Sequence, residues 1–171
     1  MLDNPKSLRG FTAVVPTFSA AQAIIDRAGE GIITMTDVQV ENAKIILEGM
    51  AKGARSCLDK GIRMGVGNDA IVPYVTQYNL WKELVLLVRY LQVSHRHAIY
   101  LATLSSAKAI GVDKITGSIE QGKSADFMVV DQNPLDDLKA LAMPSMVCCM
   151  GRLIEHPAIR EVKGVDTYRI V

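Results

Sequence analysis

The most informative stretch of this sequence is IRMGVGNDA, residues 62–70. A short apolar run opens it, and a Gly-Asn-Asp loop that ends in Asp69 follows. A long helix is predicted before it, because Thr36 and Gln39 fit a capping box and Gly61 is a stop signal. A helix, a tight turn and a strand in this order are typical of the αβ half of a βαβ unit.

A second buried strand is predicted nearer the N-terminus. Residues 11–15 form an apolar, β-branched run that Pro16 ends. Ser19 then stands where it can cap a helix over residues 20–28. The two strands and the helix between them extend the α/β pattern.

Three further stretches have helical periodicity. The helix after Thr36 carries apolar residues at helical spacing, namely Val38, Ala43, Ile46, Met50 and Ala54. The helix over residues 80–91 has an apolar face made of Trp81, Leu84, Leu87, Val88 and Leu91. Ser94 caps a third helix, which is predicted to end at Gly111.

The character of the chain changes at Thr116. Short apolar runs at residues 117–119, 126–131, 146–150 and 152–154 are separated by turn residues and predict strands. The glycines of residues 117–126 follow a helix and precede a strand, so a hairpin is favoured over a phosphate-binding loop. This part of the chain is therefore expected to be a small β module.

Composition narrows the function. The chain has 171 residues, and its 19 basic and 18 acidic residues leave a net charge of +1, which disfavours nucleic-acid binding through bulk charge. It has no apolar run long enough to span a membrane and no secretory leader, so a cytoplasmic protein is expected. Its three cysteines are expected to be reduced and mostly buried.

Asp69 is the leading candidate for chemistry. It follows a buried strand in an α/β context, where ligand-binding and catalytic groups collect, and a carboxylate there can bind a metal or accept a proton from water. Its position alone leaves an Asx turn or a helix cap as an equal alternative. His95 and His97 resemble a metal-ligand pair, but residues two apart on a helix point in different directions, so solvated first-turn residues are favoured.

Three motifs in sequence order carry a resemblance to a known family. They are GVGNDA at residues 65–70, ATLSSAKAIG at 102–111 and GSIEQGKSADFMVVD at 117–131. Together they resemble the C-terminal portion of the metal-dependent amidohydrolase superfamily, in its imidazolonepropionase and Xaa-Pro dipeptidase-like branch. Residues 11–18 also resemble the family's seventh barrel strand. The resemblance covers nearly the whole chain after residue 10.

The resemblance implies a fold. Members of the superfamily have a (β/α)8 TIM barrel and a small β-sandwich built from both chain ends. Residues 1–115 are then expected to be part of the barrel, with strand seven at 11–15 and strand eight at 62–66. Residues 116–171 match the sandwich segment.

The resemblance also implies a chemistry. Asp69 matches the family's strand-eight aspartate, which binds metal in many members and moves a proton from metal-bound water to the leaving nitrogen. Asn68 stands where threonine is common. The implied cofactor is a divalent metal, with zinc as the first choice, and the implied substrate is a small amide or peptide. Tyr74 and Tyr78, on the following loop, are candidates for lining the substrate pocket or for packing.

The family's histidine metal ligands lie on strands that have no counterpart here, and a complete barrel needs about 250 residues. We therefore expect the chain to be a C-terminal fragment that is inactive alone and that pairs with a missing N-terminal half or forms a homo-oligomer. The alternative is a non-catalytic α/β assembly or binding module derived from the same ancestor.

Overall fold

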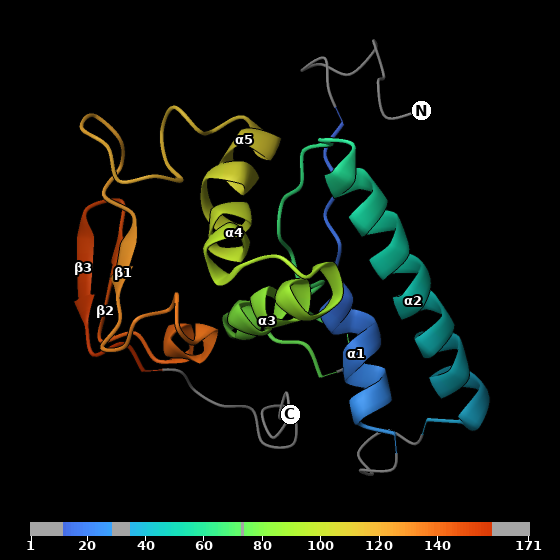
Figure 1. Cartoon of the computed structure of the whole chain (residues 1–171). Helices are drawn as coiled ribbons and strands as arrows, with labels where there is room; N and C mark the ends of the chain where they lie inside the picture. The colour runs from blue at the N-terminus through green and yellow to red at the C-terminus, as the bar shows by residue number, and fades with distance from the viewer. Residues whose placement is uncertain (1–11, 29–34, 73, 159–171) are drawn as a thin grey trace.

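The computed structural model describes residues 12–28, 35–72 and 74–158. Its α-helices are α1 (Phe18–Asp26), α2 (Asp37–Asp59), α3 (Leu80–Leu91), α4 (His95–Tyr100) and α5 (Ser106–Ile110). Shorter helical turns are η1 (Gln77–Asn79), η2 (Leu101–Ser105) and η3 (Leu138–Ala142), and the strands are β1 (Phe127–Val129), β2 (Met146–Cys149) and β3 (Arg152–Glu155). Figure 1 shows the sheet at one end of the molecule and α2 at the other.

The two strands predicted around Val14 and Met64 lie side by side and run parallel. Val14 N donates to Arg63 O, and Gly65 N donates to Val14 O, both at 2.9 Å. Val14 and Met64 form one isolated parallel bridge, so the extended pairing is shorter than the apolar runs predicted. Phe11 lies outside the described residues. That these are the seventh and eighth strands of a barrel stays a prediction.

The opposite edge of the Met64 strand is covered by serine side chains. Ser105 Oγ donates to Met64 O at 2.5 Å, and Val66 N donates to Ser106 Oγ at 3.0 Å. Ser106 Oγ in turn donates to Leu101 O at 2.7 Å, within the π-helical turn η2 that joins α4 to α5. The helix thus satisfies strand groups that another strand would otherwise bind.

The main core lies where α1, α2 and α3 pack together. Its buried residues are Phe18, Ala21, Leu47, Ala54, Met64, Leu86, Leu87, Leu91 and Leu101. The predicted capping box of α2 is present, with Gln39 N donating to Thr36 Oγ1 and Thr36 N donating to Gln39 Oε1. The apolar face predicted for α2 is partly wrong, because Val38 and Ile46 are exposed while Leu47 is buried instead.

The predicted start and end of the helix after Ser94 are both confirmed. Ser94 Oγ accepts from His97 N at the start of α4, as predicted for a cap. Gly111 ends α5 in a left-handed conformation with φ +75°. Both signals are local, which is why the sequence alone shows them.

The strands form one antiparallel sheet in the order β1-β2-β3. Phe127 lies opposite Cys148, and Cys148 lies opposite Leu153. Three of the four predicted strands are confirmed, but residues 117–119 are not a strand. Gly117 has φ +93° and lies so close to the helix that an added Cβ would be 2.6 Å from Ala107 Cβ. The chain therefore turns here, and the hairpin predicted for residues 117–126 is replaced by a loop.

The three cysteines are free, but they are not mostly buried as expected. Cys148 is buried in the sheet and Cys57 is half-buried, whereas Cys149 is exposed. Among the residues that the structure describes, no helix is both long and apolar enough to cross a bilayer.

Candidate active site

Asp69 lies in the loop that follows the Met64 strand, as predicted. Its side chain is exposed, while the neighbouring Asn68 is buried. Asn68 Nδ2 donates to Thr76 O at 2.9 Å, which joins the two ends of the loop. The carboxylate of Asp69 therefore stands on a loop that is closed at its base, and it faces solvent.

The backbone of this loop is strained. Asp69, Ile71 and Tyr74 all have positive φ, at +54°, +92° and +68°. Aspartate tolerates this conformation, but a β-branched residue such as Ile71 adopts it rarely. Ile71 is 97% exposed, so burial of its side chain does not offset the strain. Clusters of such strained residues are typical of functional loops.

The two tyrosines proposed for substrate binding lie in different surroundings. Tyr74 is buried and packs with Ala23 and Val75, and the guanidinium carbon of Arg27 lies 4.9 Å from the centre of its ring. Tyr78 is half-buried in η1. These contacts are those of the packing role that the sequence left open for Tyr74, and the substrate-binding role of both residues stays a prediction.

The two histidines of α4 have different neighbours. His95 Nδ1 lies 2.8 Å from Leu135 O, and the ring of His97 lies 6.0 Å from the ring of Tyr100. Both occupy the first turn of α4, as predicted, but they are half-buried rather than fully solvated.

The donor set around Asp69 does not fit a hydrolytic zinc ion. Such a site has three protein ligands and one open position. Over residues 12–28, 35–72 and 74–158, no group of three or more His, Cys, Asp or Glu residues could hold a metal ion. Asp69 could supply one ligand, and we derive no catalytic step through a metal bound by this chain.

Glu83 was not identified from the sequence, although its environment is the most unusual of any carboxylate in the described residues. Its side chain is 0% exposed. Oε1 accepts from Phe18 N at 2.8 Å, and Oε2 accepts from Ser19 N at 2.8 Å and from Ser19 Oγ at 2.6 Å. Burial raises the pKa of Glu83 to about 7, against the lowering effect of these hydrogen bonds.

These bonds also correct the predicted start of α1. The helix begins at Phe18 rather than after Ser19, and Thr17 provides no side-chain cap. Glu83 on α3 accepts from the helix start instead. The available signal was a carboxylate that shares a helix face with Leu87 and Leu91, four and eight residues further on.

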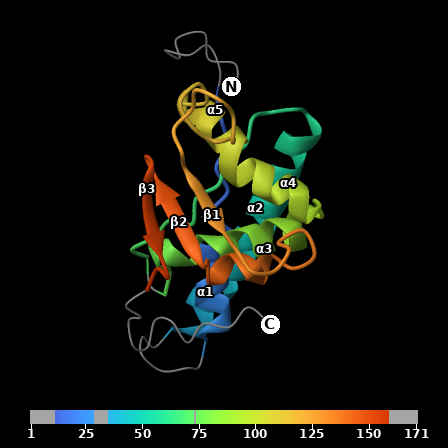
Figure 2. The ribbon, with the colours of Figure 1, turned by 90° about the vertical axis from the view of Figure 1, so that its left-hand side faces the viewer.

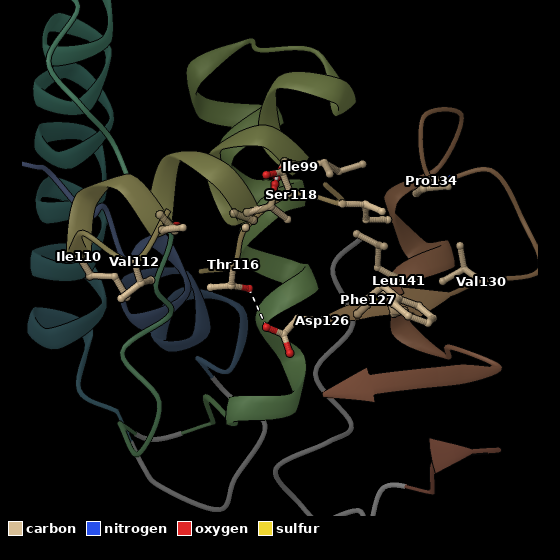
Figure 3. A pocket seen from close by; sticks show the side chains of 17 residues that line it. Ile99, Ile110, Val112, Thr116, Ser118, Asp126, Phe127, Val130, Pro134 and Leu141 are labelled. Atoms are coloured by element: carbon tan, nitrogen blue, oxygen red, sulfur yellow. Dashed lines mark hydrogen bonds between the residues drawn. The ribbon is translucent and has the colours of Figure 1, made fainter. Parts of the chain in front are cut away.

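A separate cavity of about 600 Å³ lies between the α4–α5 helix and β1 (Figure 3). Ile99, Ala102, Phe127 and Leu141 are among its apolar lining residues. At its polar side Asp126 accepts from Thr116 Oγ1 at 2.8 Å and from Met150 N at 2.6 Å, and these bonds lower the pKa of Asp126. Asp69 is not among the lining residues, so this cavity is distinct from the candidate site.

Comparison with known proteins agrees with the motifs. The chain is 35% identical to the imidazolonepropionase of Picrophilus torridus over 118 residues, which are 69% of this chain and 28% of that protein. It is 46% identical over 83 residues to a 5-methylthioadenosine/S-adenosylhomocysteine deaminase of Saccharophagus degradans, covering 41% of this chain and 18% of that enzyme.

Solved structures show the same likeness. A putative prolidase from Bifidobacterium longum matches with a TM-score of 0.88 and 41% identity, over 96% of this chain and 40% of that one. A Xaa-Pro dipeptidase with bound methionine matches with a TM-score of 0.70 and 29% identity, over 84% and 34%. The chain thus spans less than half the length of these proteins. The profile of the amidohydrolase family matches residues 11–154, and this chain belongs to that family.

Proposed function

We propose that this chain is the C-terminal part of a hydrolase that cleaves a C–N bond in a small amide, cyclic amide or dipeptide. The observation that carries the proposal is the exposed Asp69 carboxylate on a strained loop at the end of a parallel strand. The similarity to an imidazolonepropionase and to a putative prolidase supports this substrate class.

In this proposal Asp69 acts as an acid and a base. One of its carboxylate oxygens takes a proton from the attacking water, whose oxygen bonds to the carbonyl carbon. The same proton then passes to the leaving nitrogen as the C–N bond breaks, which regenerates the carboxylate. Because the side chain of Asp69 is exposed, its oxygens can face a substrate in both steps.

The family is generally metal-dependent. Since residues 12–28, 35–72 and 74–158 hold no complete donor set, we propose that a divalent metal, with zinc as the first choice, takes its other ligands from a polypeptide outside this chain. The isolated chain would then be inactive. A homo-oligomer is the alternative source of a completed site.

The test supplies the missing portion. The part of the putative prolidase from Bifidobacterium longum that this chain does not match is joined to the chain. Metal content and hydrolysis of Xaa-Pro dipeptides, small linear amides and cyclic amides are then measured. We expect the joined protein to bind metal and hydrolyse one of these classes, and the chain alone to do neither.

The Asp69→Asn variant tests the assignment of the acid and base. We expect its turnover to fall by about 10²–10⁴-fold, as is typical when a general acid–base group is removed. Asp131→Asn is the matched control, since Asp131 is also exposed, and it should retain turnover. Undiminished hydrolysis by Asp69→Asn would refute the role of Asp69.

A non-catalytic assembly or binding module remains the second candidate, supported by the incomplete donor set of the described residues. It predicts the opposite result in the same experiment. The joined protein would fold and bind no metal, and no substrate of the panel would be hydrolysed.

A further inference from the structure

Glu83 joins α3 to the start of α1, because its partners Phe18 and Ser19 lie 65 and 64 residues before it in the sequence. It lies in the first turn of α3, and it accepts hydrogen bonds from the first two backbone N–H groups of α1 and from the Ser19 hydroxyl. These N–H groups have no partner within their own helix, because the first turn of any helix leaves its donors free. The helix N-terminus also carries partial positive charge, which favours a carboxylate there.

The start of α1 is in contact with the segment that leads to Asp69. Thr17 directly precedes α1, and an added Cβ on Gly67 would lie 4.0 Å from Thr17 Cγ2 and 3.0 Å from Val15 Cγ1. The backbone of Gly67, two residues before Asp69, therefore packs closely against the side chain of Val15, which lies three residues before the start of α1. A shift of the α1 start would therefore displace the backbone of Gly67, because close-packed atoms transmit such movements.

A second set of contacts joins the Asp69 loop to α3. Asn68 Nδ2 binds Thr76 O, and Thr76 directly precedes η1, which leads into α3 and Glu83. The contacts thus lead from the Asp69 loop into α3, from Glu83 on α3 to the start of α1, and from Val15, just before α1, to Gly67. Phe18 and Tyr90 stiffen the contact between α1 and α3, with their ring centres 5.3 Å apart.

We propose that Glu83 is a positioning residue for the Asp69 loop: its ionised carboxylate holds the start of α1, and through the preceding residues 15–17 and the contact of Val15 with Gly67 it sets the placement of Asn68 and Asp69. Its importance for catalysis rests on the proposed function, whereas the coupling itself is a property of this chain.

The charge of Glu83 controls the coupling. The ionised group offers acceptors to all three donors, whereas a protonated oxygen becomes a donor and faces one of them unfavourably. The pKa of Glu83 is raised by burial and lowered by Ser19 and Phe18. The other charged groups on these two helices are Asp26 on α1 and Lys82 and Arg89 on α3. Arg27 is the C-cap residue of α1.

None of these charges is a cause of the shift, and neither is any charge on α2, the third helix of the core. Protonation of Glu83 itself is therefore the event that loosens the start of α1. It takes place near pH 7, where the pKa of Glu83 lies.

The experiment is a pH titration of the full chain by NMR. The side-chain carboxyl carbon of Glu83 and the backbone amides of Gly67, Asn68 and Asp69 are followed together. We expect these amides to show a titration step with the midpoint of Glu83, near pH 7. Hydrogen exchange of Asn68 should speed up by about tenfold, after correction for intrinsic rates, once Glu83 is protonated.

Two variants separate positioning from general stability. Glu83→Gln should abolish the step at Gly67 and Asn68, while Glu48→Gln on α2, where Glu48 is exposed, should retain it. Ser19→Ala removes one bond that lowers the pKa, so the midpoints of Glu83 and Asn68 should rise together. A role confined to folding would not move these two midpoints in step.

The proposal is overturned if the Phe18 and Ser19 amides titrate with Glu83 while those of Gly67, Asn68 and Asp69 do not. The wild-type titration alone decides this, should Glu83→Gln fail to fold. Hydrolysis plays no part in the measurement. Failure of the proposed function would therefore leave the coupling intact, and failure of the coupling would leave Asp69 as acid and base.

Discussion

Glu83 is the residue whose burial makes the stability of this chain depend on pH. Its pKa is raised from the ordinary value of 4.5 to about 7. Between these values the folded state holds a proton that the unfolded state has lost, so the free energy of unfolding falls as pH rises. The full effect is about 3 kcal/mol, present below the unfolded pKa and lost as pH passes the folded one.

Urea unfolding across this pH range checks the prediction. Wild type and Glu48→Gln should lose stability as pH rises, and Glu83→Gln should lose much less. An equal slope in all three proteins would assign the pH dependence to other groups.

Gly117 is held by close contact as well as by its backbone conformation. An added Cβ would lie 2.6 Å from Ala107 Cβ and 3.2 Å from Leu104 Cα, at φ +93°. Gly122 has a similar φ of +89° but nothing within 4 Å. We expect Gly122→Ala to cost about 1 kcal/mol for the backbone alone, and Gly117→Ala about 2 kcal/mol more because of overpacking.

Thermal and urea unfolding of the two variants give the comparison directly. Equal losses would mean that the loop moves away from Ala107 at little cost.

At the scale of residues, the sequence predicted Asp69 but not Glu83. Asp69 stands out because the strand, the glycine and the carboxylate are neighbours in the chain. The partners of Glu83 are 64 and 65 residues away, so its role depends on how α1 and α3 pack. A charge on an apolar helix face is a warning of such a role, but it does not name the partner.

The start of α2 depends on its capping box. Thr36 Oγ1 accepts from Gln39 N, and the Gln39 side chain accepts from Thr36 N. Thr36→Ala removes one of these acceptors, and we expect a loss of about 1 kcal/mol in the free energy of unfolding. Thr36→Ser keeps the hydroxyl and should lose little. Urea unfolding measures both, and equal losses would show that the hydroxyl is not what stabilises the helix start.

The Met64 strand depends on the helix that covers its second edge. Ser105 is buried, and its hydroxyl donates to Met64 O. Ser105→Ala leaves a buried carbonyl without this donor, at a cost of about 1–3 kcal/mol. Ser56→Ala, at an exposed position of α2, is the control and should be close to neutral. Chemical unfolding that shows no difference between the two variants would mean that water replaces the hydroxyl.

At the scale of elements, the features predicted correctly are those whose signal lies within a few residues in the sequence. The caps at Thr36 and Ser94 and the stop at Gly111 involve residues within one helical turn, and all three are confirmed. The strand predicted at residues 117–119 is wrong because the approach of Gly117 to Ala107 decides the local backbone. The start of α1 is misplaced because its cap comes from Glu83 on α3.

At the scale of the whole molecule, the two parallel strands are too few to close a barrel. The structure covers one open edge with Ser105 and Ser106, which the sequence did not suggest. The order of three motifs was enough to identify the family. The chain spans 28% of one relative and 40% of another, so the greater part of each relative lies outside the match.

Both faces of the sheet carry apolar side chains, and the ends of β3 add one charged residue to each face, Arg152 and Glu155. Met128, Val147 and Ile154 lie opposite one another on one face, and Phe127, Cys148 and Leu153 share the other. Met128 and Ile154 are 49% and 46% exposed on the first face, and Phe127 and Leu153 are 39% and 48% exposed on the second. Figure 2 shows the sheet on the side of the molecule turned to the viewer, with α1 and α3 behind it. An antiparallel sheet in water normally presents one polar face, so a second apolar face is expected to find a partner.

We therefore expect the isolated chain to self-associate through this sheet, with a light-scattering mass that rises above 18.6 kDa as concentration increases. Burying the two half-exposed side chains is worth about 1.5–3 kcal/mol each at most, so the association should be weak and concentration-dependent. Met128→Lys with Ile154→Lys should shift the mass toward the monomer, because each lysine would bring a charge into the contact. Val38→Lys with Ile45→Lys is the matched control, since both residues are exposed and apolar but lie on α2. A larger effect of the α2 pair would indicate that the chains associate through α2 instead. A wild-type monomer at the highest concentration would show that the sheet tolerates water on both faces and that the chain needs no second copy.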